Sequence, residues 1–266
     1  IGTGFSCKVP PHNPTDVKEN LKRFIRGEAL KPMKPWFRGF KGTVTASDEG
    51  VWTLRGLWHS SGDKVEVTEL PPGTWTQTYK EFLEGLVEKN VIKNYNNHST
   101  EEDVRFVITG YKGSAPEKDL KLTSTVRSTN MYLHGPRGIE KFDTPLDILK
   151  VYAEERMKLY LKRKEYLVAT LAKRSGMAMD RANFVKGILE GTLKVMGLKK
   201  ADAEENMLKK FKKVDGSFEH LWGLKTSRYT QEAVQELKQE ARTLLDELKR
   251  IQEMTTKDMW LEDLDR

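Results

Sequence analysis

The 266 residues include 46 Lys and Arg against 39 Asp and Glu, a formal net charge of +7. Charged residues form 32% and hydrophobic residues 37% of the chain, which excludes a wholly disordered protein and indicates a modest core with a large solvated surface. Cys7 is the single cysteine, so no intramolecular disulfide can form and a reducing compartment is expected. No apolar run of about 18 residues and no signal-peptide pattern occurs, so the sequence predicts no membrane association.

Ile1 stands on a glycine-rich strip, IGTG, with no starting methionine before it. We expect this residue either to lie inside a longer protein or to have been exposed by cleavage. Positive charge is concentrated just downstream, because residues 8–41 hold nine Lys or Arg and three Asp or Glu, a net charge of +6 (9 − 3). This balance favours a polyanionic partner, with a solvated surface as the alternative.

Residues 13–27, NPTDVKENLKRFIRG, predict the first helix. Asn13 is suited to the N-cap, Pro14 to the first helical position, and Gly27 to the end. The helix is amphipathic, with an apolar face opposite a basic one. The apolar positions are Val17, Leu21, Phe24 and Ile25, and the basic ones are Lys18, Lys22, Arg23 and Arg26.

Short β-type runs follow between residues 40 and 70: FKGTVT, VWTLRGLWHS and KVEVTEL. Turn residues separate them, so we predict a small antiparallel sheet. A helix is expected over residues 75–89, and two further strands in DVRFVIT and STNMYLHG. Residues 1–141 are therefore predicted to form an α+β domain.

Two long helices are predicted in the second half. One begins with the cap Thr144 and runs to about Arg174, with Lys164 interrupting its apolar stripe; the other covers residues 230–254 and has apolar spacings of 3 and 4. We predict an antiparallel coiled coil of residues 142–175 and 229–256, with a parallel dimeric coiled coil as the alternative. Residues 176–228 would form its tip, with a short helix in RANFVKGILEG and another in KADAEENMLKKFKK, and residues 257–266 a C-terminal tail.

No catalytic or metal-binding constellation is evident from the residues alone. The five histidines are scattered and none has metal-ligand spacing. Glu262, Asp263 and Asp265 are interpreted as an acidic exposed tail, in preference to a cation site. One apolar cluster could either cap the core of the tip or form a dimer patch. Its members are Phe218, Leu221, Trp222 and Leu224.

Five phrases in order, IGTGFS, VPPHNP, MKPWFRGFKGTV, ELPPGTWTQTYKEFL and HLWGLKTSRYTQE, make the whole chain resemble eukaryotic-type DNA topoisomerase II, a type IIA enzyme. The resemblance implies a piece of an ATP-dependent, Mg²⁺-requiring enzyme that passes one duplex through another. This piece would lie after the catalytic tyrosine and comprise the tower, the coiled-coil arm and the C-gate. It would therefore hold no catalytic residue, metal or cofactor, and the Arg228–Tyr229 pair is assigned no catalysis.

The resemblance also implies the partners and the residues that meet them. Ile1 would insert between base pairs and bend duplex DNA, and a homodimer would form through the C-gate. The parent would be nuclear, with an organellar or viral enzyme as the alternative. The competing hypothesis is a non-enzymatic coiled-coil dimerisation protein with a solvated basic surface. The expected phosphate contacts are Lys31, Lys34, Arg38 and Lys41, and the expected dimer contacts are Phe218, Leu221, Trp222 and Leu224.

Overall fold

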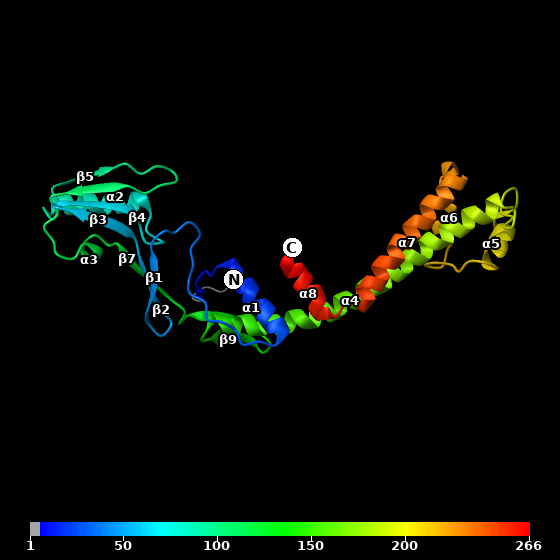
Figure 1. Cartoon of the computed structure of the whole chain (residues 1–266), viewed down its shortest axis with the longest axis horizontal. Coiled ribbons are helices and arrows are strands. Elements are labelled where there is room, and N and C mark those ends of the chain that lie inside the picture. Colours follow the sequence, from blue (N-terminus) through cyan, green and yellow to red (C-terminus); the bar gives the residue numbers. More distant parts are fainter. Residues whose placement is uncertain (1–5) are drawn as a thin grey trace. The chain divides into compact units, whose positions relative to one another are not determined.

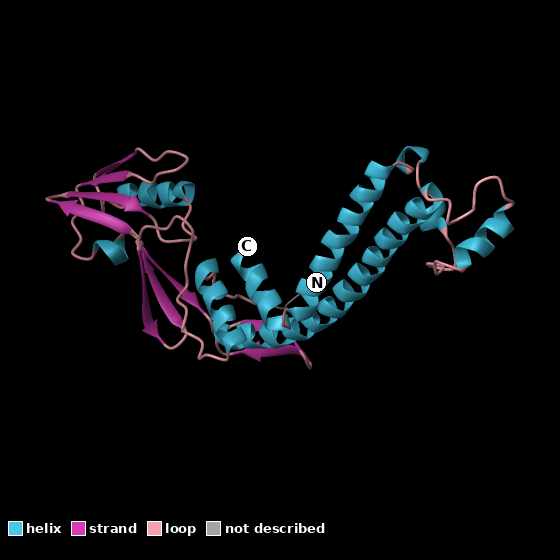
Figure 2. Ribbon diagram, turned by 45° about the vertical axis from the view of Figure 1, so that its right-hand side comes forward, coloured by secondary structure: helices cyan, strands magenta, loops and turns pink. Residues whose placement is uncertain are grey.

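The computed structural model describes residues 6–266, so the prediction for Ile1 lies outside the described residues. The chain divides into two compact units, and the division falls after Glu154, inside one long helix. Figure 1 labels most of the helices and strands, and Figure 2 colours helices cyan and strands magenta. Among the described residues, no helix combines the length and apolar character that a membrane span requires.

Helix α1 (Pro14–Arg26) forms where the sequence predicts it. The Asn13 side chain accepts a hydrogen bond from the backbone N–H of Thr15, and Pro14 begins the helix. Gly27 ends it in the left-handed conformation, φ 76°, which glycine adopts without a steric penalty. Leu21 and Ile25 are buried, which confirms the predicted apolar face.

The first unit contains two antiparallel sheets and a separate hairpin. The three-stranded sheet has the spatial order β1 (Thr43–Asp48), β2 (Val51–Arg55), β7 (Thr123–Arg127). The four-stranded sheet has the order β3 (Leu57–Ser61), β4 (Lys64–Glu69), β6 (Phe106–Thr109), β5 (Asn94–Asn97). The hairpin consists of β8 (Met131–Gly135) and β9 (Gly138–Phe142).

The predicted single sheet over residues 40–70 is wrong, because the run VWTLRGLWHS belongs to two sheets. Gly56 separates β2 from β3 and donates its N–H to the carbonyl oxygen of Leu122, 2.9 Å away. A Cβ atom at Gly56 would collide with the carbonyl oxygen of Glu69. The close passage of these backbones therefore requires glycine, and here the chain leaves one sheet for the other.

The core of the first unit lies between the four-stranded sheet and α2 (Thr76–Glu88), the helix predicted over residues 75–89. Alternate residues of β4 and β6 face this core, and Tyr79 on α2 packs edge-on against Phe106 with ring centroids 5.1 Å apart. Each fully buried apolar side chain contributes roughly 1.5–3 kcal/mol. The fully buried set on these three elements is Val65, Val67, Leu83, Phe106 and Ile108. A single-turn helix, α3 (Pro116–Asp119), lies before β7.

The second unit is helical, apart from its loops. Helix α4 (Pro145–Leu189) has 45 residues, so the predicted end at Arg174 is wrong, and RANFVKGILEG continues α4 instead of forming its own helix. A glycine inside a helix costs only about 1 kcal/mol relative to alanine. Burial of α4 beyond Gly176 outweighs that cost, because Ala178, Ala182 and Phe184 are all at most 2% exposed.

Helix α7 (Gln231–Glu253) lies alongside α4 and runs in the opposite direction (Figures 1 and 2). Near its start, Val234 and Leu237 pack with Ala182 and Val185 of α4. Near its end, the Nζ of Lys164 donates hydrogen bonds to the carbonyl oxygens of residues 252 and 254, at 2.9 and 2.6 Å. Lys164, which interrupts the apolar stripe, therefore caps the end of the neighbouring helix.

Beyond the helix pair, residues 190–230 close around the end of α4. They include α5 (Lys200–Leu208), α6 (Glu219–Trp222) and a 3-10 turn, Thr226–Arg228. Phe184 of α4 is the centre of this small core, with Phe211 and Trp222 edge-on at 6.0 and 6.4 Å. From here on, the tip means residues 184–230, in place of the predicted range 176–228.

Candidate nucleic-acid interface

The basic segment, residues 28–41, links α1 to β1 without helix or strand of its own. Arg23 of α1 fixes its beginning, because Nε donates to the carbonyl oxygen of Ala29 at 2.6 Å and Nη1 lies 3.2 Å from the carboxylate of Glu28. Further along, the N–H of Trp36 donates to the carbonyl oxygen of Pro11 at 2.9 Å. Side-chain and backbone contacts therefore hold an irregular segment in place.

The aromatic side chains of this segment turn inward while the cations face solvent. Pro35 is buried, and Phe37 and Phe40 are half-buried with their rings edge-on at 6.4 Å. They flank a turn that carries Arg38 and Gly39, the latter at φ 81°. The segment therefore packs its aromatic rings against the fold and leaves its cations at the surface.

The four predicted phosphate-binding residues are all exposed, but their surroundings differ. Lys41 forms an ion pair with Asp103, with Nζ 3.1 Å from Oδ1, and this hydrogen bond raises the pKa of Lys41. Within residues 6–266, no carboxylate lies within ion-pair distance of the other three side chains, Lys31, Lys34 and Arg38. These three are therefore the cations best placed to meet an external anion.

Lys31 and Lys34 also line one hollow of about 440 Å³, together with Arg23, Trp52 and the acidic residues Asp16 and Glu19. An adjoining hollow of about 630 Å³ shares Trp52 but is lined largely by prolines and short polar side chains. Concave surfaces with several cations and an aromatic side chain are suited to a sugar–phosphate backbone. The structure thus brings Lys31 and Lys34 together, whereas Arg38 lies on the turn and Lys41 beside Asp103.

The predicted basic face of α1 is partly used for contacts inside the unit. Arg23 is committed to Glu28 and Ala29, and Lys22 lies 3.6 Å from the carboxylate of Glu19. Arg26 is exposed. The helix consequently offers less free positive charge than its sequence indicates.

The tip corrects part of the predicted dimer surface. Phe218 and Leu221 are 1% and 0% exposed and pack in the core of the tip around Phe184, so they are not available to a second copy. Trp222 and Leu224 are half-buried at the edge of the same core. Phe218 and Leu221 therefore cap the core of the tip, whereas Trp222 and Leu224 remain partly exposed at its edge.

Other apolar side chains are exposed at the tip, and sequence reasoning missed them. Met196 and Leu198 are 65% and 45% exposed. Leu198 lines a hollow of about 380 Å³ with Trp222. The sequence signal was an apolar loop that begins at Gly191 and continues past Gly197, both at positive φ, to Leu198. Such a loop places apolar side chains outside any helix or strand.

The C-terminal residues form helix α8 (Thr256–Asp265), so the prediction of an acidic exposed tail is wrong. A capping box begins the helix: Thr255 and Asp258 exchange hydrogen bonds between side chain and backbone. Trp260 is 2% exposed and stacks on Tyr160 of α4 with ring centroids 5.4 Å apart. Buried aromatic stacking attaches α8 to α4.

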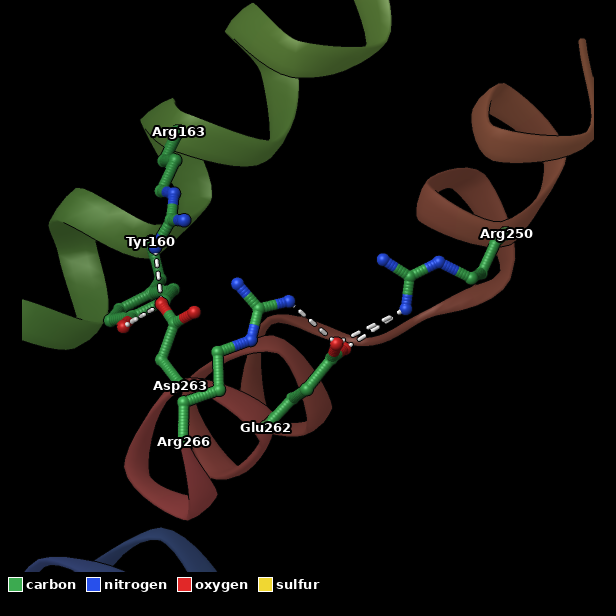
Figure 3. A network of polar contacts seen from close by, with 6 residues as sticks. All are labelled: Tyr160, Arg163, Arg250, Glu262, Asp263 and Arg266. Carbon is green, nitrogen blue, oxygen red and sulfur yellow. Dashed lines mark hydrogen bonds and ion pairs between the residues drawn. The ribbon is translucent and has the colours of Figure 1, made fainter. Parts of the chain in front are cut away.

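The acidic residues of α8 have specific partners (Figure 3). Asp263 accepts a hydrogen bond from the hydroxyl of Tyr160 at 2.6 Å and pairs with Arg163; these contacts, the hydroxyl first, lower the pKa of Asp263. Glu262 pairs with Arg250 of α7 at 3.0 Å and with Arg266 at 2.8 Å. Their charge therefore serves attachment to α4 and α7, while Asp265 is exposed.

The remaining chemistry-bearing residues have structural surroundings. Cys7 is exposed, and its Sγ accepts the N–H of Tyr132 at 3.3 Å. Arg228 pairs with Glu236 at 2.6 Å, and Tyr229 packs at the edge of the tip core, where burial raises its pKa. Across the described part of the chain, no three His, Cys, Asp or Glu side chains gather into a possible metal site.

Comparison with known proteins identifies the family. Residues 1–265 match the family of the DNA gyrase/topoisomerase IV A subunit. The chain belongs to this topoisomerase family. The resemblance inferred from the five sequence phrases is thereby confirmed.

The relatives include DNA topoisomerase 2 of Penicillium chrysogenum, 33% identical over 100% of this chain and 19% of the relative. DNA topoisomerase 2 of Plasmodium falciparum is 36% identical over 79% of this chain and 16% of the relative. The chain thus spans about a fifth of the length of the curated relatives it matches.

The fold matches the crystal structure of the DNA-binding, cleavage and re-ligation domain of Plasmodium falciparum topoisomerase II. The TM-score is 0.92 at 31% identity, covering 100% of this chain and 41% of that one. All described elements of this topoisomerase segment, α8 included, therefore have a counterpart region in a DNA-binding domain.

Proposed function

We propose that this chain is the part of a type IIA DNA topoisomerase that follows the catalytic tyrosine and supports duplex DNA at the break. The observation that carries the proposal is the match of the whole chain to a DNA-binding, cleavage and re-ligation domain, together with the exposed cations of the basic segment. The parent enzyme would pass one duplex through a transient double-strand break in another, using ATP and Mg²⁺ bound by its other parts.

Three regions would divide this work. Residues 1–141 form the tower that bends and holds DNA, residues 142–175 and 229–256 form a coiled-coil arm, and residues 176–228 form the C-gate. The chain by itself would be catalytically inert. Among residues 6–266, no three His, Cys, Asp or Glu side chains gather into a possible metal site. The enzyme would act in the nucleus, or alternatively in an organelle or as a viral protein.

DNA bending would result from two physical terms. Insertion of the β-branched side chain of Ile1 at a base step costs a few kcal/mol of stacking energy. Phosphate contacts along the bent arms offset this cost, because each one releases a condensed counterion. Lys31, Lys34 and Arg38 are proposed for these contacts, with Lys41 joining them when DNA displaces Asp103.

Replacing Ile1 by alanine in the full-length topoisomerase that carries this segment is expected to abolish most DNA bending while retaining weak unbent binding. Energy transfer between dyes at the two ends of a short duplex measures the bend. Ile139→Ala is the matched control, because Ile139 is 67% exposed on β9 and is expected to leave the bend unchanged. Full bending by the Ile1→Ala enzyme would remove this residue from the mechanism.

We also propose a homodimer through the tip, with Met196 and Leu198 as its principal contacts and Trp222 and Leu224 beside them. Exposed apolar side chains of this kind lose contact with water when two copies pair. A dimer joined at the two tips would form the exit gate for the transported duplex. In this proposal, Met196 and Leu198 take the place of Phe218 and Leu221, which were expected as dimer contacts but are buried in the tip.

The double variant Met196→Asp, Leu198→Asp is expected to convert a dimeric chain into a folded monomer, because two carboxylates cannot be buried unpaired in the interface. Equilibrium sedimentation measures the mass and circular dichroism the fold. The matched control is Leu159→Asp, Leu161→Asp, which alters side chains 52% and 55% exposed on α4. A wild-type monomer at tens of micromolar, or a dimer that survives the tip substitutions, would contradict the interface.

A further inference from the structure

We infer that Asn20 is a positioning residue for duplex DNA: its buried amide holds the basic segment against α1 so that Lys31 and Lys34 present a preformed surface. The inference rests on the proposed function, because it names a residue that would arrange the cations proposed to contact DNA. Asn20 itself is 3% exposed, so its contribution would act entirely through the segment it binds.

Every hydrogen-bonding group of the Asn20 amide has a partner in the fold. Nδ2 donates to the carbonyl oxygens of Asp16 and Lys31, each at 3.1 Å, and Oδ1 accepts the N–H of Lys31 at 2.7 Å. The bonds to Lys31 run in both directions, like those between paired residues of two strands. The Asn20 side chain thus makes the two hydrogen bonds with the Lys31 backbone that a neighbouring β-strand would otherwise make.

The segment needs such a substitute because it cannot form regular structure at this point. Pro32 and Pro35 lack an N–H, and residues 28–34 contain no helix or strand. Arg23 fixes the backbone at Ala29, and Pro11 fixes it at Trp36. Between these two points, Asn20 binds the backbone of Lys31, three residues before Lys34.

The choice of asparagine is not explained by α1 alone. Asparagine is a weaker helix former than leucine or alanine, and position 20 is buried, with the apolar residues Val17 and Phe24 three and four positions away on the same side of the helix. A buried amide is tolerated only when its groups are paired, and two of its three hydrogen bonds are to Lys31. Asn20 therefore stabilises the basic segment, at the expense of a lower helix propensity in α1.

Preorganisation links this tie to DNA affinity. Lys31 and Lys34 line the same hollow when the segment is held, so both cations reach neighbouring phosphates without further ordering. A released segment would carry the same charges but would lose side-chain and backbone freedom on binding. We expect fewer simultaneous phosphate contacts, and therefore both weaker binding and a smaller salt dependence.

The test uses the whole chain with Asn20→Leu, which fills the buried volume, and Asn20→Ala, which favours the helix. Each is titrated with a fluorescent duplex at several salt concentrations. We expect about tenfold weaker binding at low salt and a log–log slope smaller by about 1, given ~0.9 per phosphate contact. Amide hydrogen exchange at Lys31 should accelerate, while that of the four-stranded sheet stays unchanged. Asn96→Leu, at an exposed position of β5, is the control and should behave as wild type.

The outcomes separate this inference from the proposed function. If the wild-type chain shows no salt-dependent duplex binding, the proposed function fails and the inference falls with it. If the wild type binds but both variants keep the wild-type slope, the inference alone is wrong, even when Lys31 exchanges faster. If Asn20→Leu loses the helicity of α1, the slope of Asn20→Ala decides.

Discussion

Replacing Trp260 by alanine is expected to lower the free energy of unfolding of the second unit by about 3–5 kcal/mol. The indole ring is 2% exposed and stacks on Tyr160, so its removal leaves a cavity where α8 meets α4. Chemical denaturation followed by far-ultraviolet circular dichroism measures the change. The effect should be large because both rings of the stack, Tyr160 and Trp260, are 2% exposed.

Trp75→Ala is the matched control for this substitution. Trp75 is 76% exposed at the N-terminal end of α2, and its loss should change the free energy of unfolding by less than about 0.5 kcal/mol. A Trp260→Ala chain as stable as the control would mean that α8 is not attached to α4 in solution. The ion pairs of Glu262 and Asp263 would then be surface contacts without consequence.

Neutralising Lys31, Lys34 and Arg38 together, each to glutamine, is expected to weaken duplex binding by ten- to a hundredfold at low salt. The log–log dependence on salt should flatten by about 2–3 units, since each phosphate contact contributes ~0.9. Lys41 is left in place because Asp103 already pairs with it. Fluorescence anisotropy with a short duplex, repeated across salt concentrations, measures both quantities.

A second triple variant controls for net charge. Lys199→Gln, Lys200→Gln and Lys212→Gln remove the same three charges from exposed positions of the tip. This variant should keep nearly the wild-type slope if the basic segment is the contact surface. Equal losses in the two variants would show that only the total charge matters and that the segment has no special role.

Features set by neighbouring residues could be predicted from the sequence. The cap Asn13, the first-turn Pro14 and the terminal Gly27 define α1 within one stretch of chain, and the structure places the helix ends there. The excess of basic residues in this stretch could be counted in the same way, and Lys31, Lys34, Arg38 and Lys41 are all exposed. The family followed from short phrases that occur in order along the chain.

Features set by distant partners were missed. Strand β7 pairs with β2, about 70 residues earlier, and its residues TSTVR show no clear alternation in burial. The acidic residues of α8 resemble a solvated tail until Arg163, 100 residues away, is placed beside Asp263. The Ser175–Gly176 pair indicates a helix end locally, but packing of the later residues on α7 and the tip continues α4 through it.

Asn20 is a third case, because its position in the helix can be read from the sequence but its hydrogen-bond partner cannot. A polar residue at the buried position 20 of an amphipathic helix signals a specific partner. The sequence does not show which backbone segment Asn20 binds. Lys31 lies beyond a turn, and the path of that turn depends on Gly27 and Arg23. The candidate interface could therefore be predicted as a set of charges, whereas the contacts that hold it required the fold.

The salt dependence of duplex binding by the wild-type chain is the most direct measurement of the proposed role. If Lys31, Lys34 and Arg38 contact phosphates, the logarithm of the association constant should fall linearly with the logarithm of salt concentration, with a slope of about −3. Two duplexes of unrelated sequence should give the same slope and affinities within a few-fold, because the contacts are to the backbone. Affinity that does not change with salt, or no binding at low salt, would contradict the proposal that this surface supports DNA.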